Sequence, residues 1–592
     1  MNLRDWLTRK NLIITAVILG VLVATACYFA LRRPQPVEME RYVAASSLAY
    51  LEINNLADVA DGLTGTRAWR ELGPALGLSS QLRQIGLMAD LVGRTGLGPE
   101  EVVLAGRAQL ALALTDVEAQ TGQTDEGPYL HFKPRLALII ETHARPATAA
   151  RLVNDRAIIV AQRIYGMTVA QEEGEHQGTR LLIFRGANPD RPLVAAALGS
   201  VIVLTNHLEA MKATLDTIAG RAPALAEDPT LARLKPDMAA GAAVTAFITE
   251  TGINKLIALL PPLAASRYAA EPETVASFTG LLEHMASQAV AGLLYSAEFK
   301  DGGVVDRYLT ALKPGIGEAL TEALKPAQGA GFKSPQLIPR SAEEVTLLNI
   351  ERAGELPERA LKQLAPHVDI VAGLALREFV INLRKQYGIE GGESVGDAIG
   401  HEITLINLGD GGSQAMLLSV KDKDRLAPFI TRYLTRGDAK ITTDSVGGTE
   451  LRLSSNEDGR AAAFIGSYLV LATQPQITQL LEAQGAGSVV AADERLQTAM
   501  ALRPPGTSIV SLKPADRRAG ELLLAVSRLT RVTDGSRELL EQEQVRRALD
   551  GLPPTVGFTE FRAYGIYNET RSAIGNFGLL ASLVGGGGDA EK

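Results

Sequence analysis

Short sequence patterns occur twice along this chain of 592 residues, separated by nearly the same distance each time. Residues 197–204 read ALGSVIVL, and residues 464–471 read FIGSYLVL. Their glycines, Gly199 and Gly466, differ in position by 466 − 199 = 267. In each pattern the Gly-Ser pair separates two apolar runs. This is typical of a hairpin turn, because glycine adopts positive φ without a steric penalty.

Two further matches lie downstream of these hairpins. The segment GAAVTAF, which starts at Gly241, matches GTSIVSL, which starts at Gly506, with an offset of 506 − 241 = 265. The segment FKD at Phe299 is matched with YNE at Tyr567, with an offset of 567 − 299 = 268. Because a similar offset recurs at several places, we predict an internal duplication of one structural unit.

The front of the two copies is less regular. LEI, which ends at Ile53, matches LNI, which ends at Ile350, and here the offset is 350 − 53 = 297. The first copy therefore holds about 30 more residues than the second before its hairpin, and long insertions of this kind are usually loops. We assign them to the polar stretch 118–128 and its neighbours.

Each copy alternates strand patterns joined by tight turns with helical segments, without a regular strand-helix-strand order. This pattern is typical of an α+β fold with mainly antiparallel sheets and helices on one face. We therefore expect two related α+β domains, residues 38–313 and 340–584. A connector rich in Gly, Pro and Ala, residues 314–339, joins them, and residues 585–592 form a flexible tail.

Local signals predict several element boundaries. Asn206 and Thr473 are good N-cap residues for the helices that follow the two hairpins, and Pro475 fits the first turn of the second helix. The sequence Asp301-Gly302-Gly303 predicts the turn of the hairpin that closes the first copy.

An uncharged stretch, residues 11–31, precedes the body of the chain. A helix rises about 1.5 Å per residue, so about 20 apolar residues cross a bilayer core of roughly 30 Å. A cleavable signal peptide would have a shorter apolar core, so we expect a retained transmembrane helix. The cations before it, Arg4, Arg9 and Lys10, favour a cytoplasmic segment 1–10 and an extracytoplasmic body. Residues 32–37, with two prolines, form a spacer.

The chain has a single cysteine, Cys27, which lies inside this stretch. The sequence around it loosely resembles the site at which bacterial lipoproteins are cleaved and acylated, although the usual large aliphatic residue three places earlier is missing. The alternative is a structural cysteine that packs as a small apolar residue. In either case the body has no disulfide and no thiolate metal site.

Composition limits the classes of partner. The chain is 46% hydrophobic and 21% charged, which is a globular balance, and its net charge of −8 is modest for this length. Aromatic residues make up only 5%, and no run of Lys or Arg occurs in the body, so the features of nucleic-acid binding are missing from the sequence.

No sequence motif predicts a catalytic, cofactor-binding or metal-ligating residue. No two histidines have the i, i+3 or i+4 spacing of a metal pair on a helix, and His401-Glu402 lacks the second histidine of a zinc-protease motif. We expect surface or structural roles for all of them. The seven histidines are His131, His143, His176, His207, His284, His367 and His401.

Two segments resemble functional motifs without satisfying them. Residues 329–334, GAGFKS, resemble a phosphate-binding loop but lack its spacing, and they lie in the connector. Residues 172–176, EEGEH, form a dense acidic patch that offers carboxylate oxygens for a divalent cation. The patch occurs in one copy only, so we expect it to be a solvated turn between strands.

Taken together, the uncharged stretch, the opening segment SLAYLEI at residues 47–53, the Gly199-Ser200 hairpin and the segment DPTL at residues 228–231 resemble a known pattern. The chain resembles bacterial membrane-anchored envelope proteins that are catalogued only as a domain of unknown function. This resemblance implies a membrane-anchored bacterial protein and no site residues.

We therefore expect a non-enzymatic, single-pass membrane protein whose extracytoplasmic body binds an envelope protein or another ligand. Ligands often lodge in a cleft between related halves. Two alternatives remain: a lipid carrier that encloses an acyl chain, and an envelope hydrolase whose site is assembled from distant residues. The identity of the ligand and the oligomeric state are left open.

Overall fold

The computed structural model describes residues 36–74, 104, 106–124, 127–188, 191–259, 283–328, 331–386, 395–409, 414–435, 439–456, 459–514, 520 and 542–576. Within this part of the chain, 20 strands form one sheet. The strands of the first half are β1 (Ala49–Ile53), β2 (Gln109–Thr124), β3 (Gly127–Glu141), β4 (Ala170–His176), β5 (Thr179–Arg185), β6 (Leu193–Leu198), β7 (Val201–Thr205), β8 (Val244–Thr249), β9 (Val290–Lys300) and β10 (Gly303–Leu312).

The second half contributes the other ten strands. They are β11 (Glu344–Asn349), β12 (Ile399–Asn407), β13 (Ala415–Val420), β14 (Ile441–Val446), β15 (Thr449–Ser454), β16 (Arg460–Ile465), β17 (Tyr468–Thr473), β18 (Ile509–Lys513), β19 (Thr555–Arg562) and β20 (Gly565–Ser572). Helices lie between them. They are α3 (Leu56–Gly65), α4 (Arg67–Leu72), α7 (Pro146–Tyr165), α8 (Leu208–Ile218), α9 (Pro229–Leu234), α10 (Glu250–Ile257), α13 (Ile316–Ala323), α14 (Leu356–Leu364), α15 (Ile370–Gln386), α16 (Val395–Ala398), α17 (Ala427–Leu434), α18 (Gln474–Gly485), α19 (Glu494–Ala501) and α22 (Glu543–Gly551).

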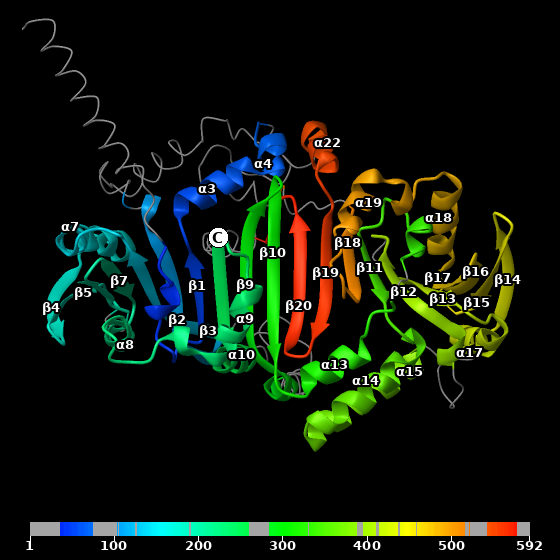
Figure 1. Cartoon of the computed structure of the whole chain (residues 1–592), viewed down its shortest axis with the longest axis horizontal. Coiled ribbons are helices and arrows are strands. Elements are labelled where there is room, and N and C mark those ends of the chain that lie inside the picture. Colours follow the sequence, from blue (N-terminus) through cyan, green and yellow to red (C-terminus); the bar gives the residue numbers. More distant parts are fainter. Residues whose placement is uncertain are drawn as a thin grey trace, which may run out of the picture.

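The pairings place the strands in a palindromic order. From one edge to the middle the order is β4, β5, β6, β7, β3, β2, β1, β8, β9 and β10. From the middle to the other edge it is β20, β19, β18, β11, β12, β13, β17, β16, β15 and β14. All of these pairs are antiparallel, and β10 pairs with β20 in the centre (Figure 1). Each half thus presents the same pairing pattern in reverse order.

The register at the centre makes the relation between the halves explicit. The hairpin β9–β10 corresponds to β19–β20, since β10 begins at Gly303 and β20 at Gly565, an offset of 565 − 303 = 262. Arg307 of β10 lies opposite Glu569 of β20, and 569 − 307 is also 262. At this point two equivalent positions therefore face each other, as they do on a local two-fold axis.

The expected division of the body into two α+β domains, each with a sheet of its own, is wrong. One continuous antiparallel sheet runs through both halves, from β4 to β14. The physical reason is the free edge that separate sheets would have left on β10 and on β20. Each edge would expose unpaired N–H and C=O groups, and the two strands satisfy them by pairing with each other.

The expectation that helices cover only one face is also wrong. Met211 of α8, Leu231 of α9 and Leu181 of β5 belong to one buried apolar cluster on one face of the sheet. Val153 of α7 packs with Leu182 on the opposite face. Consecutive residues of β5 point to opposite faces of the sheet, so both faces of this region are covered. In the centre of the sheet, α3, α4 and α22 lie at one end of the strands, and α13, α14 and α15 lie at the other (Figure 1).

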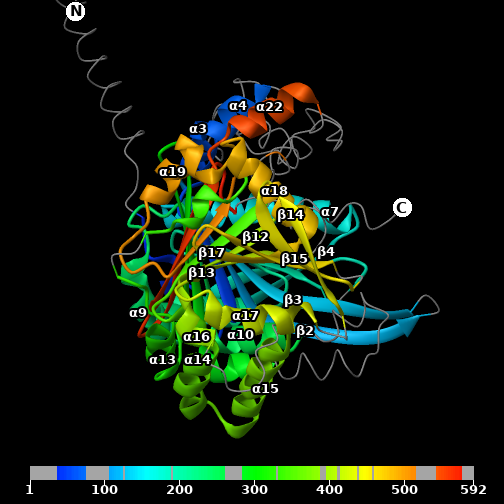
Figure 2. The ribbon, with the colours of Figure 1, turned by 90° about the vertical axis from the view of Figure 1, so that its right-hand side faces the viewer.

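The stretch 11–31, predicted to be a transmembrane helix, lies outside the described residues, as do segments 1–10 and 585–592. Among the helices that the structure describes, none combines the length and the apolar character needed to cross a bilayer. The extra residues of the first half coincide in part with the predicted polar stretch 118–128. There β2 and β3 form a long two-stranded arm that projects from the body (Figure 2).

Candidate functional site: a cavity at the junction of the two halves

The site is built around the turn between β9 and β10. Asp301 and Gly302 occupy its two central positions, with φ of 53° and 74°. Two-residue hairpin turns with positive φ at both positions match the twist of the flanking strands, and Asp-Gly is a favoured sequence for them. The predicted turn is thus confirmed. The carbonyl of Gly302 accepts a hydrogen bond of 2.6 Å from the amide of Arg67, which ties the turn to the start of α4.

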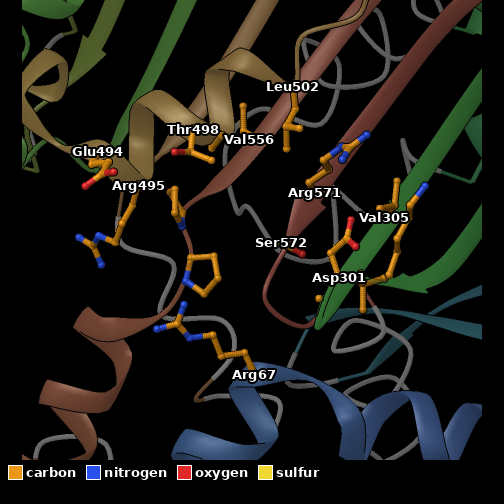
Figure 3. Close-up of a pocket in the computed structure, with 16 residues that line it drawn as sticks. Arg67, Asp301, Val305, Glu494, Arg495, Thr498, Leu502, Val556, Arg571 and Ser572 are labelled. Atoms are coloured by element: carbon orange, nitrogen blue, oxygen red, sulfur yellow. The ribbon is translucent and has the colours of Figure 1, made fainter.

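A cavity of about 480 Å³ lies between this turn, helix α19 and the ends of β19 and β20. Figure 3 shows side chains from four parts of the chain around it: Arg67 from α4, Thr498 from α19, Val305 from β10 and Arg571 from β20. The cavity therefore belongs to both halves and does not exist in either half alone.

Much of the cavity wall is apolar. Val305 and Val556 are buried strand residues, with 4% and 1% of their surface exposed. Leu502, just after α19, borders the cavity with 47% of its surface exposed, which is unusual for leucine in the described part of this protein. Pro553 and Pro554 complete this side. Such walls favour an apolar group in the cavity, because its transfer from water is favourable.

Three arginines around the cavity already have partners. Arg571 donates from Nε to Glu569 at 2.9 Å, and Arg67 donates to Glu71 at 2.5 Å. Arg495 binds the N-cap carboxylate of α19, Asp493, at 3.1 Å, and also donates to the carbonyl of Asp550 at 2.7 Å. These guanidinium groups thus hold the walls of the cavity in place.

The remaining charges at the rim have opposite signs. The side-chain ammonium of Lys300 makes no hydrogen bond or ion pair with any described part of the chain, and the same holds for the carboxylates of Asp301 and Glu494. All three side chains belong to residues that line the cavity. The rim therefore offers one ammonium and two carboxylate groups to an occupant.

The position that corresponds to the cavity lies at the turn between β19 and β20, and the protein's own side chains fill it. We refer to this position as the equivalent place. At the offset of the two hairpins, Lys300, Gly302 and Val305 correspond to Arg562, Tyr564 and Tyr567, since 562 − 300, 564 − 302 and 567 − 305 all equal 262. Tyr567 is a buried core residue, and Tyr564 packs against the same core. The guanidinium of Arg562 lies 4.2 Å from the ring centre of Tyr567. The corresponding positions in the first half are Val305, which lines the cavity, and Gly302 of the adjoining turn.

The neighbouring helices differ in the same way. Helix α9 begins after Asp228 and helix α19 after Asp493, an offset of 493 − 228 = 265, and both aspartates cap their helix. At this offset Asp237 corresponds to Leu502. Asp237 accepts a hydrogen bond of 2.5 Å from the hydroxyl of Tyr564 and forms an ion pair of 3.0 Å with Arg562.

The pKa values at the filled place reflect this network. Burial raises the pKa of Tyr564, and the hydrogen bond to Asp237 raises it further. Burial opposes the charge of Arg562, but its hydrogen bonds to Glu560 and Tyr564 outweigh this effect and raise its pKa. Both groups therefore keep their ordinary protonation states at neutral pH, and the filled place is a stable structural contact.

The sequence matches do not give the correct offset between the two hairpins. Matching Phe299 with Tyr567, at an offset of 268, is wrong, because Phe299 lies in β9 and Tyr567 in β20. The strand pairings instead make Phe561 the equivalent of Phe299, since 561 − 299 = 262. In this register Gly302 corresponds to Tyr564 of the other half. A sequence comparison at an offset of 262 would therefore have shown that the two halves differ at the cavity.

The histidines are spread over the structure. Nε2 of His176 lies 3.0 Å from Asp216, and Nε2 of His284 lies 2.7 Å from Asp369. His143 lies 3.1 Å from the side-chain oxygen of Gln109. Burial lowers the pKa of His207, whose Nδ1 is buried without a hydrogen-bond partner in the described part of the chain.

The other three histidines lie elsewhere. His131 is in β3, His401 is in β12, and the ring of His367 approaches Gly315. Among the residues known to line the junction cavity there is no histidine. The described residues also contain no group of three or more His, Cys, Asp or Glu side chains that would hold a metal ion.

The two segments that resemble motifs have structural partners. Lys333 and Ser334, at the end of the phosphate-loop-like segment, donate their amides to the carboxylate of Glu402 at 3.1 and 3.0 Å. Glu402 is 1% exposed and also accepts a hydrogen bond of 2.6 Å from Tyr468. These amides are therefore used internally. Burial, and then this hydrogen bond, raise the pKa of Tyr468.

The acidic patch 172–176 is not a turn but part of strand β4, paired with β5. Its carboxylates form ion pairs across the two strands, Glu173 with Arg180 and Glu172 with Arg185. These pairs are exposed to solvent. The acidic side chains therefore stabilise the β4–β5 pair rather than gather around a cation.

A second, larger cavity of about 970 Å³ lies beside His207. Its lining contains four basic residues, Lys133, Arg135, Arg185 and Arg191, together with apolar residues, and Arg135 pairs with Asp116 at 3.6 Å. Comparisons with known proteins found no matching family model, no similar curated protein and no similar solved structure.

Proposed function

We propose that this protein is a non-enzymatic binding protein of the bacterial cell envelope, and that its ligand or partner occupies the junction cavity. The observation that carries this proposal is the difference between two equivalent places. One is closed by Arg562, Tyr564 and Tyr567, and the other is an open cavity of about 480 Å³.

The size and position of the cavity support a binding role. Sites for small molecules or for inserted side chains usually have volumes of about 300 to 1,000 Å³, apolar walls and a few polar groups. The junction cavity has Val305, Val556 and Leu502 as walls and Lys300, Asp301 and Glu494 at its rim. It also lies between the two halves, where ligands often bind.

The location in the envelope rests on the sequence alone. Its basis is the uncharged stretch 11–31, which lies outside the described residues. Separation of cell membranes from soluble fractions tests it directly. Recovery of the full-length chain in a soluble cytoplasmic fraction would remove this part of the proposal and leave the binding site untouched.

The two alternative functions find less support. A lipid carrier needs a long apolar enclosure, but charged residues border the junction cavity, and the second cavity has four Lys and Arg residues in its lining. A hydrolase needs a base beside a nucleophile and a bound substrate. The pairs His176–Asp216 and His284–Asp369 are not part of the lining of either cavity.

Native mass spectrometry of the full-length protein, purified from bacterial membranes, tests the proposal. We expect a reproducible additional mass that is released by denaturation. Thr498 is exposed on α19 at the cavity, so Thr498→Trp fills the cavity without changing a buried residue, and we expect it to abolish the additional mass.

Met167→Trp is the matched control, because Met167 is 81% exposed and lies outside the cavity lining. We expect this variant to retain the bound mass. An additional mass that persists unchanged in Thr498→Trp would place the ligand elsewhere and contradict the assignment to this cavity.

A further inference from the structure

We propose that the junction cavity is a receptor for an aromatic side chain of a partner polypeptide, which inserts its ring where the other half holds Tyr564 and Tyr567. This inference rests on the proposed function and specifies the partner. Phenylalanine suits the cavity better than tyrosine.

The expectation that the occupant carries an aromatic ring follows from the side chains at the equivalent place. There the turn after β19 carries Tyr564, which packs into the core beside Tyr567. The corresponding strands and helix surround the junction cavity, but Val305 lines it at the position of Tyr567, and Gly302 of the adjoining turn corresponds to Tyr564. The space left between the walls is therefore the space that aromatic side chains occupy in the other half.

The preference for phenylalanine follows from the helix side. The hydroxyl of Tyr564 donates to Asp237 and accepts a hydrogen bond of 3.2 Å from Arg562, and the cavity has Leu502 and Lys300 at the corresponding positions. A tyrosine in the cavity would meet Leu502 where Tyr564 meets the acceptor Asp237, and burying a hydroxyl group without this hydrogen bond is unfavourable. A phenyl ring has no such group to satisfy.

The source of the ring follows from the rim. Tyr564 enters its place from a hairpin turn, so an aromatic side chain that projects from a polypeptide backbone is the arrangement already present in this fold. The ammonium of Lys300, which has no partner among the described residues, and the carboxylates of Asp301 and Glu494 lie at the rim. Groups of both signs complement the amides and mixed charges of a polypeptide, whereas a purely anionic or cationic ligand would meet repulsion from part of the rim.

Capped amino acids provide the test, with binding to the full-length protein measured by ligand-observed NMR. N-acetyl-phenylalaninamide represents a phenylalanine inside a chain, N-acetyl-tyrosinamide adds the hydroxyl, and N-acetyl-leucinamide lacks the ring. We expect the phenylalanine probe to bind at least about fivefold more tightly than the tyrosine probe, because Leu502 offers the tyrosine hydroxyl no acceptor. We expect the leucine probe to bind more weakly still.

Two variants from different elements fill the cavity. Val305→Tyr introduces into β10 the residue that β20 has at Tyr567, and Thr498→Trp fills the cavity from α19. We expect both to abolish binding of the phenylalanine probe and Met167→Trp to retain it. Circular dichroism confirms folding, and because Thr498 is exposed, its variant keeps the test decisive if Val305→Tyr fails to fold.

Each other outcome overturns the inference in a recognisable way. Equal binding of the leucine and phenylalanine probes would show that no ring is recognised. Much tighter binding of free phenylalanine than of its capped form would assign the site to the amino acid and not to a polypeptide. If no probe binds, but denaturation releases a ligand that Thr498→Trp removes, the proposed function stands and the aromatic receptor does not.

Discussion

At the scale of single residues, the most unusual group in the first half is a buried glutamate. Glu52 of β1 has 6% of its surface exposed and lies near the carboxylate of Glu40, which has 4% exposed. Burial, and then the negative charge of Glu40, raise the pKa of Glu52 to about 8. Glu52 therefore carries a proton in the folded protein at neutral pH, which no sequence pattern had indicated.

This pKa predicts a pH-dependent stability. Between pH 4.5, the ordinary value, and about 8, the unfolded chain loses the proton of Glu52 while the folded protein keeps it, so stability falls as pH rises through this range. We expect Glu52→Gln to remove this loss and to raise the free energy of unfolding at pH 9 by on the order of 4 kcal/mol, with little effect at pH 4.

Urea denaturation of both proteins across this pH range measures the effect. Glu175→Gln is the control, because Glu175 is an exposed residue of β4 and should leave the pH profile unchanged. Parallel profiles for wild type and Glu52→Gln would show that Glu52 does not titrate abnormally.

At the scale of elements, Gly317 allows α13 to lie close to the β19–β20 turn, which carries Tyr564. A Cβ atom on Gly317 would lie 2.0 Å from the carbonyl oxygen of Ala563, the residue before Tyr564. Helix α13 thus packs directly against the β19–β20 turn. The closed state of the equivalent place depends on a helix in the connector as well as on the tyrosines.

This contact predicts the effect of adding one methyl group. We expect Gly317→Ala to destabilise the protein by about 1 to 3 kcal/mol, because the backbone of the turn must move. Gly485→Ala is the matched control: Gly485 is also helical, and a Cβ there has no neighbour within 4 Å. We expect the control to be neutral or slightly stabilising, as alanine favours a helix more than glycine does. Equal losses in both variants, measured by urea denaturation, would contradict the contact.

At the scale of the whole molecule, the two halves are joined by backbone and charge together. The strands β10 and β20 pair over residues 304–311 and 565–572. Across this pair Arg307 binds Glu569 at 3.3 Å, and it also binds Glu298 of its own half at 3.1 Å. Glu569 is 5% exposed, so its charge depends on these donors. Burial alone would raise its pKa, but hydrogen bonds from Tyr567 and Arg571 lower it.

We therefore expect Arg307→Ala to reduce the free energy of unfolding by about 3 kcal/mol, because it leaves two carboxylates at the junction with fewer partners. Arg384→Ala is the control. It removes an exposed ion pair with Glu358 on the surface and should change stability by less than about 1 kcal/mol.

Because the sheet is continuous, we also expect the two halves of the wild type to unfold in one transition, observed equally by fluorescence and circular dichroism. Two separate transitions in the wild type would show that the halves are energetically independent.

Local features were predictable because they depend on neighbouring residues. The turn at Asp301 and Gly302 follows from the backbone freedom of these residue types, and both Gly-Ser hairpins have glycine at positive φ, with 62° at Gly199 and 58° at Gly466. Even here tertiary contacts intervene. Asn206, predicted as an N-cap, instead binds the backbone of Leu136 and Pro134 in β3, and α8 begins after His207.

By itself, the sequence determined the strands, the turns and the recurrence of similar motifs, since these follow from side-chain alternation and backbone preference along short stretches. Only the tertiary structure decided that β10 pairs with β20 and that one sheet crosses both halves. The tertiary structure also determines that a cavity lies at the junction of the two halves. Its walls bring together Val305 of one half and Leu502 of the other, and only the strand register reveals that Val305 corresponds to the buried Tyr567. Packing between distant residues, and not local preference, distinguishes the open place from the closed one.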